Sequence, residues 1–161
     1  MIPEVMRLYL VRHGIAESPY GGGPDHARAL TPEGAAKLKR QAAFIAREGW
    51  AVDLVLCSTL LRARQTAALL APALGAPVTE EALLGPGCSL DDLEEVLGVH
   101  GNPPRVMIVG HQPAMGHLVH VLTGRRVAMR PGAAAVVEAE RLRPGAGVLH
   151  AHFDPDVTAG G

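Results

Sequence analysis

Three features are scarce in this 161-residue chain: long apolar runs, net charge and cysteine. It contains no apolar stretch of 18 residues, and residues 1–5 do not form a cationic segment followed by an apolar one, so we expect a cytoplasmic protein without a membrane partner. The formal net charge of -1, with both signs interspersed, argues against nucleic acid as a partner. The two cysteines, Cys57 and Cys88, are too few for a disulfide framework, and we expect buried thiols.

Short apolar runs that alternate with helical patterns predict one α/β domain over residues 1–153. The 48% of hydrophobic residues is ample for one core. We expect a three-layer fold with a mostly parallel central sheet, helices on both faces and an antiparallel edge strand. The predicted strands are residues 8–11, 54–57, 78–79, 105–109, 133–139 and 148–152. Residues 154–161 are predicted to form a mobile C-terminal tail.

Capping residues and glycines mark the ends of the predicted helices. Thr31 and Pro32 are typical of a helix start, and Gly49 ends that helix after Glu48. A second helix is expected from about Leu60, with Ser58 or Thr59 as its N-cap. The remaining boundaries are Leu74 before Gly75 for this second helix, Ser89 to Gly98 for the third, and about Leu122 before Gly124 for the fourth.

Polar residues follow three of the predicted strands. Arg12 and His13 come after the first strand, Ser58 and Arg62 after the second, and His111 after the fourth. Because ligands of open α/β sheets bind beyond the carboxyl ends of parallel strands, these side chains are expected to surround one small anion. The N-termini of the helices that follow would add backbone N–H donors.

Three motifs in this order resemble those of the histidine phosphatase superfamily, the phosphoglycerate mutase-like proteins. They are Leu10-Val11-Arg12-His13-Gly14, the segment 57–67 with its Arg62, and Val109-Gly110-His111-Gln112-Pro113. Residues 12–17 and 28–34 are most similar to the small SixA-type phosphohistidine phosphatases. The likeness spans roughly the whole chain.

The resemblance implies a phosphatase that works through a covalent phosphohistidine. His13 would attack phosphorus through one ring nitrogen while the other donates to a backbone carbonyl. Arg12, Gly14 and Arg62 would bind the phosphoryl oxygens, and His111 would add positive charge. Neither a cofactor nor a metal is expected, because the chain already supplies cations for the phosphoryl group.

Arg28, in the loop before the first helix, is a further candidate for contact with phosphate or with a partner. Many superfamily members that act on phosphate esters carry a glutamate that protonates the departing oxygen. Glu80 and Glu81 are the candidates for this acid, although neither aligns clearly with it.

A missing acid favours a leaving group that departs easily, such as imidazole. The expected substrate is therefore phosphohistidine in a histidine-containing phosphotransfer domain or another phosphocarrier protein. A phosphatase or mutase acting on small phosphorylated metabolites is an alternative. A non-catalytic module that binds phosphate or a phosphoprotein is another.

Other readings of the same residues are weaker. His117 and His120 share a helix face with each other, but no cysteine or carboxylate is placed to complete a metal site with His111. The sixth residue after Cys57 is Ala63 and not arginine, which argues against a cysteine-dependent phosphatase.

Overall fold

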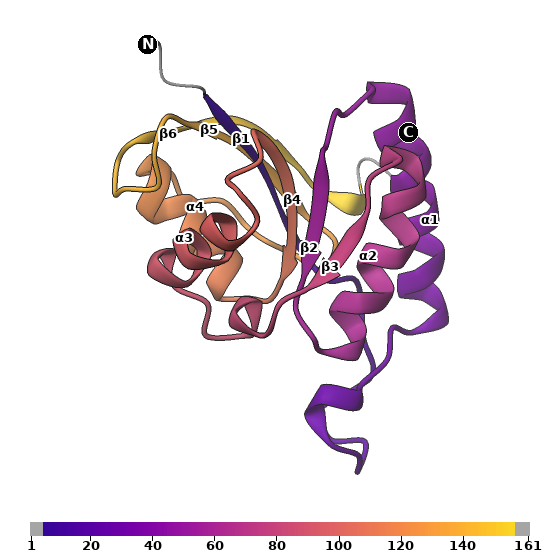
Figure 1. The fold of residues 1–161 in the computed structure, drawn as a ribbon. Helices are drawn as coiled ribbons and strands as arrows, with labels where there is room; N and C mark the ends of the chain where they lie inside the picture. The colour runs from indigo at the N-terminus through magenta and orange to yellow at the C-terminus, as the bar shows by residue number, and fades with distance from the viewer. Residues whose placement is uncertain (1–4, 157–161) are drawn as a thin grey trace.

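A six-stranded mixed sheet forms the centre of the molecule in the computed structural model, which describes residues 5–156 (Figure 1). The strands are β1 (Met6–Arg12), β2 (Leu54–Cys57), β3 (Val78–Glu80), β4 (Arg105–Gly110), β5 (Ala134–Ala139) and β6 (Gly147–Phe153). Their order across the sheet is β3-β2-β4-β1-β5-β6. The first four pair in parallel, whereas β5 runs antiparallel to β1 and β6 antiparallel to β5, which confirms the predicted sheet.

Helices cover both faces of this sheet. They are α1 (Pro32–Glu48), α2 (Leu61–Leu74), α3 (Leu90–Val99) and α4 (Ala114–Thr123), with short 3-10 helices η1 (Asp25–Ala27) and η2 (Ala82–Leu84). Helices α1 and α2 lie on one face and α3 and α4 on the other, as the three-layer prediction requires (Figure 1). Among the described helices, none is long and apolar enough to cross a membrane.

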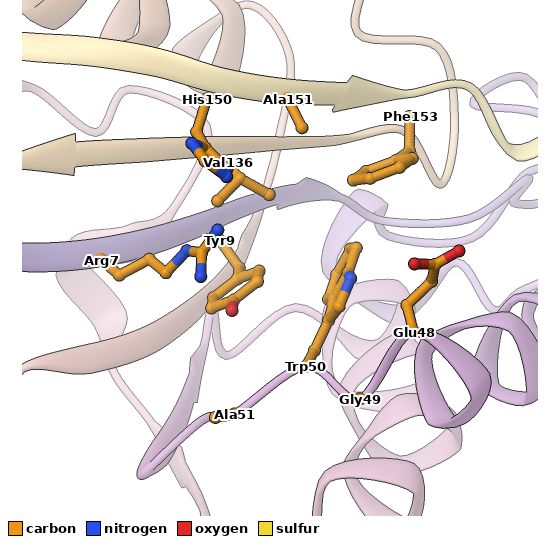
Figure 2. A pocket seen from close by; sticks show the side chains of 10 residues that line it. All are labelled: Arg7, Tyr9, Glu48, Gly49, Trp50, Ala51, Val136, His150, Ala151 and Phe153. Atoms are coloured by element: carbon orange, nitrogen blue, oxygen red, sulfur yellow. The ribbon is translucent and has the colours of Figure 1, made fainter.

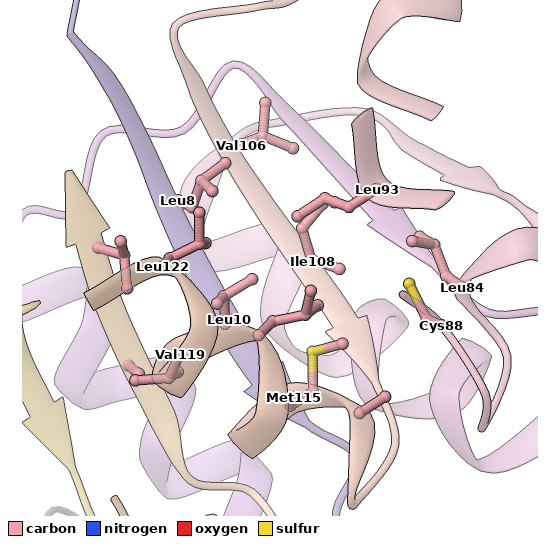
Figure 3. Close-up of a cluster of buried hydrophobic side chains, with 14 of the residues drawn as sticks. Leu8, Leu10, Leu84, Cys88, Leu93, Val106, Ile108, Met115, Val119 and Leu122 are labelled. Atoms are coloured by element: carbon pink, nitrogen blue, oxygen red, sulfur yellow. The ribbon is translucent and has the colours of Figure 1, made fainter. Parts of the chain in front are cut away.

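Alternate residues of β1 enter two separate cores. Leu8 and Leu10 pack with residues of α3 and α4 in one cluster (Figure 3), and Tyr9 and Val11 pack with residues of α1 and α2 in the other. All four are at most 2% exposed. A parallel strand covered on both faces reads as a continuous apolar run, which is why β1 was visible in the sequence.

The predicted helix ends are confirmed except for the N-cap of α2 and the C-terminal end of α3, which runs to Val99 and not to Gly98. The Thr31 hydroxyl caps α1 by accepting a hydrogen bond from the Gly34 N–H at 2.9 Å, and Gly49 ends α1 in the left-handed conformation with φ 66°. Helix α3 has a capping box in which Ser89 and Asp92 exchange hydrogen bonds. Helix α4 ends before Gly124 as expected.

The predicted cap of α2 is wrong. Leu60 is extended and takes the N-cap position, so the helix begins one residue later than a Thr59 cap would require and two residues later than a Ser58 cap would require. The Ser58 hydroxyl accepts from the N–H of Leu60, at 3.0 Å, and the first turn of α2 has no side-chain cap.

Most of the few aromatic side chains gather where β1 begins. The Trp50 ring lies between those of Tyr9 and Phe153, with centroid distances of 4.8 Å to Tyr9 and 5.3 Å to Phe153. The ring centroids of Phe44 and Phe153 are also 5.3 Å apart. Tyr9, Trp50 and Phe153, together with Arg7, border a pocket of about 280 Å³ on the α1 and α2 face of the sheet (Figure 2). This cluster seals the edge of the second core, at the opposite end of β1 from Arg12.

The predicted tail falls partly outside the described residues, which end at Asp156. Within the described part, the Asp156 carboxylate pairs with Lys37 of α1 at 2.7 Å and with Arg130 at 3.0 Å. Asp154 lies 3.6 Å from the same arginine. These contacts connect the end of β6 to α1 and to the segment before β5.

Gly34 is predicted to be indispensable for the approach of α1 to the end of β1. A Cβ atom at this position would collide with the Ile15 carbonyl oxygen, which already accepts a hydrogen bond from the Thr31 N–H at 2.9 Å. We expect Gly34→Ala to lower the free energy of unfolding by about 1–3 kcal/mol in urea titrations. Gly98→Ala, in α3 and with open space around its Cβ, is the matched control and should be neutral or stabilising by up to about 1 kcal/mol.

Candidate active site

Side chains from three strand ends surround one pocket at the carboxyl edge of the parallel strands. Arg12 and His13 end β1, His111 follows β4, and Arg62 lies in the first turn of α2 after β2. Because β4 lies between β1 and β2, the three strand ends are adjacent. The pocket, of about 270 Å³, is lined by Arg12, His13, Ile15, Ala16, Arg28, Arg62, Pro86, His111, Gln112 and Pro131. The structure thus brings together the four residues that the sequence singled out and places Arg28 beside them.

The His13 ring is held in one tautomer. Its Nδ1 lies 2.7 Å from the Gly14 carbonyl oxygen, which can only accept, so Nδ1 carries the hydrogen and Nε2 keeps its lone pair. The Gly14 N–H in turn donates to Thr66 Oγ1 at 3.0 Å, and that hydroxyl donates to the Arg62 carbonyl at 2.7 Å. One buried hydroxyl on α2 therefore connects the peptide that orients His13 to the backbone of Arg62.

Both histidines of the pocket are neutral at pH 7. The pKa of His13 is lowered to about 3, mainly by burial and also by the nearby His111, Arg62 and Arg12, against the opposing effect of the Gly14 carbonyl. Burial, followed by Arg62, lowers the pKa of His111 to about 4. The ring centroids are 5.3 Å apart. A neutral imidazole with a free lone pair is the form that can act as a nucleophile.

The pocket arginines are oriented largely by backbone carbonyls. Arg12 Nη1 donates to the Met129 carbonyl at 3.1 Å, and Arg62 Nη1 donates to the Asp25 carbonyl at 2.9 Å. Arg28 Nη1 donates to the Glu17 carbonyl at 2.7 Å. Neutral acceptors orient a guanidinium group without cancelling its charge. Among the described residues, Arg12 pairs with no carboxylate and Arg28 and Arg62 share that of Asp25, so the pocket keeps a positive potential suited to an anion.

Asp25 of η1 is a site residue that the sequence analysis missed. Its carboxylate accepts from Arg28 Nε at 2.8 Å and from Arg62 Nη2 at 3.2 Å. The hydrogen bond from Arg28 is the main reason that the pKa of Asp25 lies below its ordinary value, so the group is an anion at neutral pH. Asp25 lies in a polar, glycine-rich loop, and nothing in that pattern distinguishes it from a surface residue.

Ser58 has a different partner from the one predicted. Its buried hydroxyl lies 2.7 Å from His111 Nε2, a contact that joins the end of β2 to the end of β4. Gln112, Pro86 and Pro131 also line the pocket and were not predicted. Gln112 could have been predicted from the sequence, because it directly follows His111 at a strand end. The two prolines reach the pocket from loops, and no sequence pattern indicated them.

Some predicted site residues do not line the pocket. Gly14 does not line the pocket: its carbonyl accepts from His13 and its N–H donates to Thr66, so its direct contact with substrate stays a prediction. Glu80 and Glu81 are also outside the lining, because β3 is an edge strand about 14 Å, or three strand spacings, from β1. Glu80 lies 3.8 Å from Arg64, and Glu81 lies 2.7 Å from His100 Nε2.

The thiols are buried and unreactive in character. Burial raises the pKa of Cys57 to about 11, and the pKa of Cys88 to about 11 as well. A thiolate is therefore scarce at pH 7, in agreement with the sequence spacing that argued against a cysteine nucleophile. In the described part of the chain, no group of three or more His, Cys, Asp or Glu side chains is arranged to hold a metal ion.

Comparison with known proteins agrees with this geometry. Residues 8–85 match the family described as histidine phosphatase superfamily (branch 1). The chain belongs to the histidine phosphatase superfamily. It is 33% identical to an uncharacterised protein of Picosynechococcus sp. over 159 residues, covering 94% of this chain and 93% of that one.

Solved structures of histidine phosphatases share its fold. The tungstate complex of the protein histidine phosphatase SixA is 25% identical, with a TM-score of 0.81 over 94% of this chain and 99% of that one. The α-ribazole phosphatase from Shigella flexneri, 20% identical with a TM-score of 0.70, covers 93% of this chain and 97% of that one. The second likeness is one of fold alone. The superfamily and the likeness to SixA support a hydrolase of the phosphatase type.

Thr66 is predicted to hold the His13 tautomer in this histidine phosphatase. Thr66→Val keeps the shape but leaves the buried Gly14 N–H without an acceptor, which should lower the unfolding free energy by about 1–3 kcal/mol. The ¹⁵N chemical shifts of the His13 ring should then show a mixture of tautomers. Thr66→Ser keeps the hydroxyl and should retain both the stability and the Nδ1–H form; an unchanged ¹⁵N spectrum in the valine variant would contradict the role.

The depressed pKa values of His13 and His111 predict a loss of stability in mild acid. The unfolded chain binds a proton at each histidine below its ordinary pKa near 6.5, whereas the folded protein does not until about pH 3 to 4. Stability from these groups is therefore complete above pH 6.5 and falls as the pH decreases. We expect a loss of about 1–2 kcal/mol for each histidine between pH 6.5 and pH 5.

Urea titrations at these two pH values measure this loss. A His13→Gln variant should lose less stability over the same interval than the unmodified protein. The control is His26→Asn, which removes an exposed histidine and should preserve the original pH dependence.

Proposed function

We propose that this histidine phosphatase removes the phosphoryl group from phosphohistidine in a protein. The observation that carries the proposal is a His13 ring whose Nε2 lone pair is free, set among arginines in a pocket whose described lining contains no carboxylic acid. Arg12, Arg62 and His111 surround the phosphoryl group in this proposal. The two arginines are preoriented cations, which supply most of the catalysis of phosphoryl transfer, whereas His111 is neutral at pH 7 because its pKa is lowered to about 4, and it does not add the positive charge expected from the sequence.

The proposed reaction has two steps. His13 Nε2 attacks phosphorus, an N–P bond forms, and the P–N bond of the substrate histidine breaks as its imidazole leaves and takes a proton from water. In the second step, water attacks phosphorus, the bond to His13 breaks, and inorganic phosphate leaves with the neutral ring restored. The sum is hydrolysis of phosphohistidine to histidine and phosphate.

The lack of a protonated acid among the described pocket residues favours imidazole over an alkoxide as the leaving group. An alkoxide is strongly basic and needs a proton from the enzyme, whereas the conjugate acid of imidazole titrates near neutrality. Asp25 is hydrogen-bonded to two pocket arginines, but its lowered pKa leaves it without a proton to donate at pH 7. Glu80 and Glu81 are engaged elsewhere.

The likeness to SixA over nearly the whole of both chains supports a protein substrate. In the described chain, the loop from β1 to α1 and the segment from β3 to α3 carry only the short 3-10 helices η1 and η2, and neither has a long insertion that could close over the pocket. A phosphohistidine exposed on a phosphotransfer domain or a phosphocarrier protein fits such a site.

The test is a comparison of kcat/KM for three probes: a synthetic phosphohistidine peptide, the matching phosphoserine peptide and glucose 6-phosphate. We expect the phosphohistidine peptide to be preferred by at least about 100-fold, because a missing general acid is worth roughly 10²–10⁴ in rate for an ester. A preference for the sugar phosphate would replace the proposal with a small-ester phosphatase. Failure to turn over any probe would favour a binding module.

A second arm tests the nucleophile. His13→Ala should abolish turnover of the phosphohistidine peptide and should prevent labelling of the protein by a ³²P-phosphohistidine probe after acid-free quenching. His26→Ala is the control, since His26 is exposed in η1 and does not line the pocket. Full activity of the His13 variant would remove the proposed mechanism.

A further inference from the structure

A second groove opens beside the catalytic pocket. It has a volume of about 290 Å³ and lies between α4 and the segment that follows this helix. Gln112 lines both hollows, so the groove begins at the edge of the catalytic pocket. The lining consists of Gln112, Pro113, Gly116, His117, His120, Arg126 and Val127.

Gln112 is held at this junction by α4. Its Oε1 accepts a hydrogen bond from the Gly116 N–H at 2.7 Å, which leaves the two Nε2 hydrogens for another acceptor. A Cβ atom at Gly116 would lie 3.0 Å from both Nε2 and Oε1 of Gln112, so glycine provides the room for this arrangement. The junction is therefore built to present an amide donor.

The groove carries donors that no protein group satisfies. None of its seven lining residues is acidic. Within the described part of the chain, the side chains of His117, His120 and Arg126 form no hydrogen bond or ion pair with another residue. Arg130, four residues after Arg126, is by contrast paired with two aspartates.

This concentration of positive and donor groups is local. The whole chain has a formal net charge of -1, yet the catalytic pocket and the groove together are lined by four arginines and four of the eight histidines, without a carboxylate. The phosphoryl group accounts for the donors of the catalytic pocket. The groove is left with capacity for a second anionic group on the same substrate.

We propose that the groove binds the carboxylate of an acidic residue that neighbours the phosphohistidine in the protein substrate. Arg126 is the permanent charge and supplies a fork that matches a carboxylate, and Gln112 and the two histidines add donors. This inference rests on the proposed function and adds a rule for which phosphohistidine is chosen.

The dimensions set the position of the acid. From Ala114, where α4 begins, to His120 the helix rises about 9 Å, at 1.5 Å per residue. An extended substrate segment advances roughly 3.3 Å per residue, so the acid should lie two to four residues from the phosphohistidine. A reach of this length fits a polypeptide better than a small phosphorylated metabolite.

The experiment uses two phosphohistidine peptides with the full-length protein. One carries glutamate two to four residues on both sides of the phosphohistidine, and the other carries glutamine at the same positions. We expect kcat/KM to be about three- to tenfold higher for the glutamate peptide, because an exposed ion pair contributes only a small binding energy. The difference should come from a lower KM, with kcat unchanged. The ratio should decrease as the salt concentration rises.

Two substitutions at one position assign the effect to the groove. Arg126→Ala should bring the ratio of the two peptides to about one, and Arg126→Glu should reverse it. The matched control is Arg143→Ala, which removes an exposed arginine from the turn between β5 and β6, where β5 ends opposite Met6 at the far end of β1. This variant should keep the original ratio.

The outcomes separate the two proposals. Equal kcat/KM for both peptides, or a ratio that survives in Arg126→Glu, overturns the role of the groove while the proposed function stands. Turnover of neither peptide by the unmodified protein overturns the proposed function and the role of the groove with it. Circular dichroism of each variant establishes that the fold is retained.

Discussion

The active-site arrangement depends on cationic and imidazole side chains that are held by backbone carbonyl oxygens. The Gly14 carbonyl fixes the His13 ring, the Met129 carbonyl fixes Arg12, and the Asp25 carbonyl fixes Arg62. A carbonyl orients a donor without neutralising it, whereas a carboxylate does both. The pocket thus combines buried polar groups that are satisfied with a charge that remains available to an anion. Asp25 is the exception, because its carboxylate also pairs with Arg62, which is only 4% exposed.

The sheet makes this arrangement possible by placing β4 between β1 and β2. Side chains that follow these three strands become neighbours although they are about 50 residues apart in the sequence. The two cores on the faces of β1 hold the strand end in place, and Thr66 connects it to α2. Burial in this setting also keeps His13 and His111 unprotonated, so the same packing that stabilises the fold prepares the ring that would attack phosphorus.

The fold was largely predictable because its signals are local. Buried parallel strands are continuous apolar runs, and Thr31, Gly49 and Gly124 mark helix ends through short-range backbone chemistry. The cap of α2 could not be located in this way, since Ser58 is equally suited to cap a helix or to contact a distant histidine. The contact with His111 across the sheet decided between the two.

The sequence by itself determined the strand ends and the three motifs, because each consists of consecutive residues. The motifs in turn indicated the superfamily. Only the tertiary structure decided which polar side chains share the pocket. Asp25 binds two of the pocket arginines, and Glu80 and Glu81 do not line the pocket, since the order of strands and the path of a glycine-rich loop set distances that no local pattern encodes. The groove along α4 is of the same kind: His117, His120 and Arg126 become one surface only when the segment after α4 returns beside the helix.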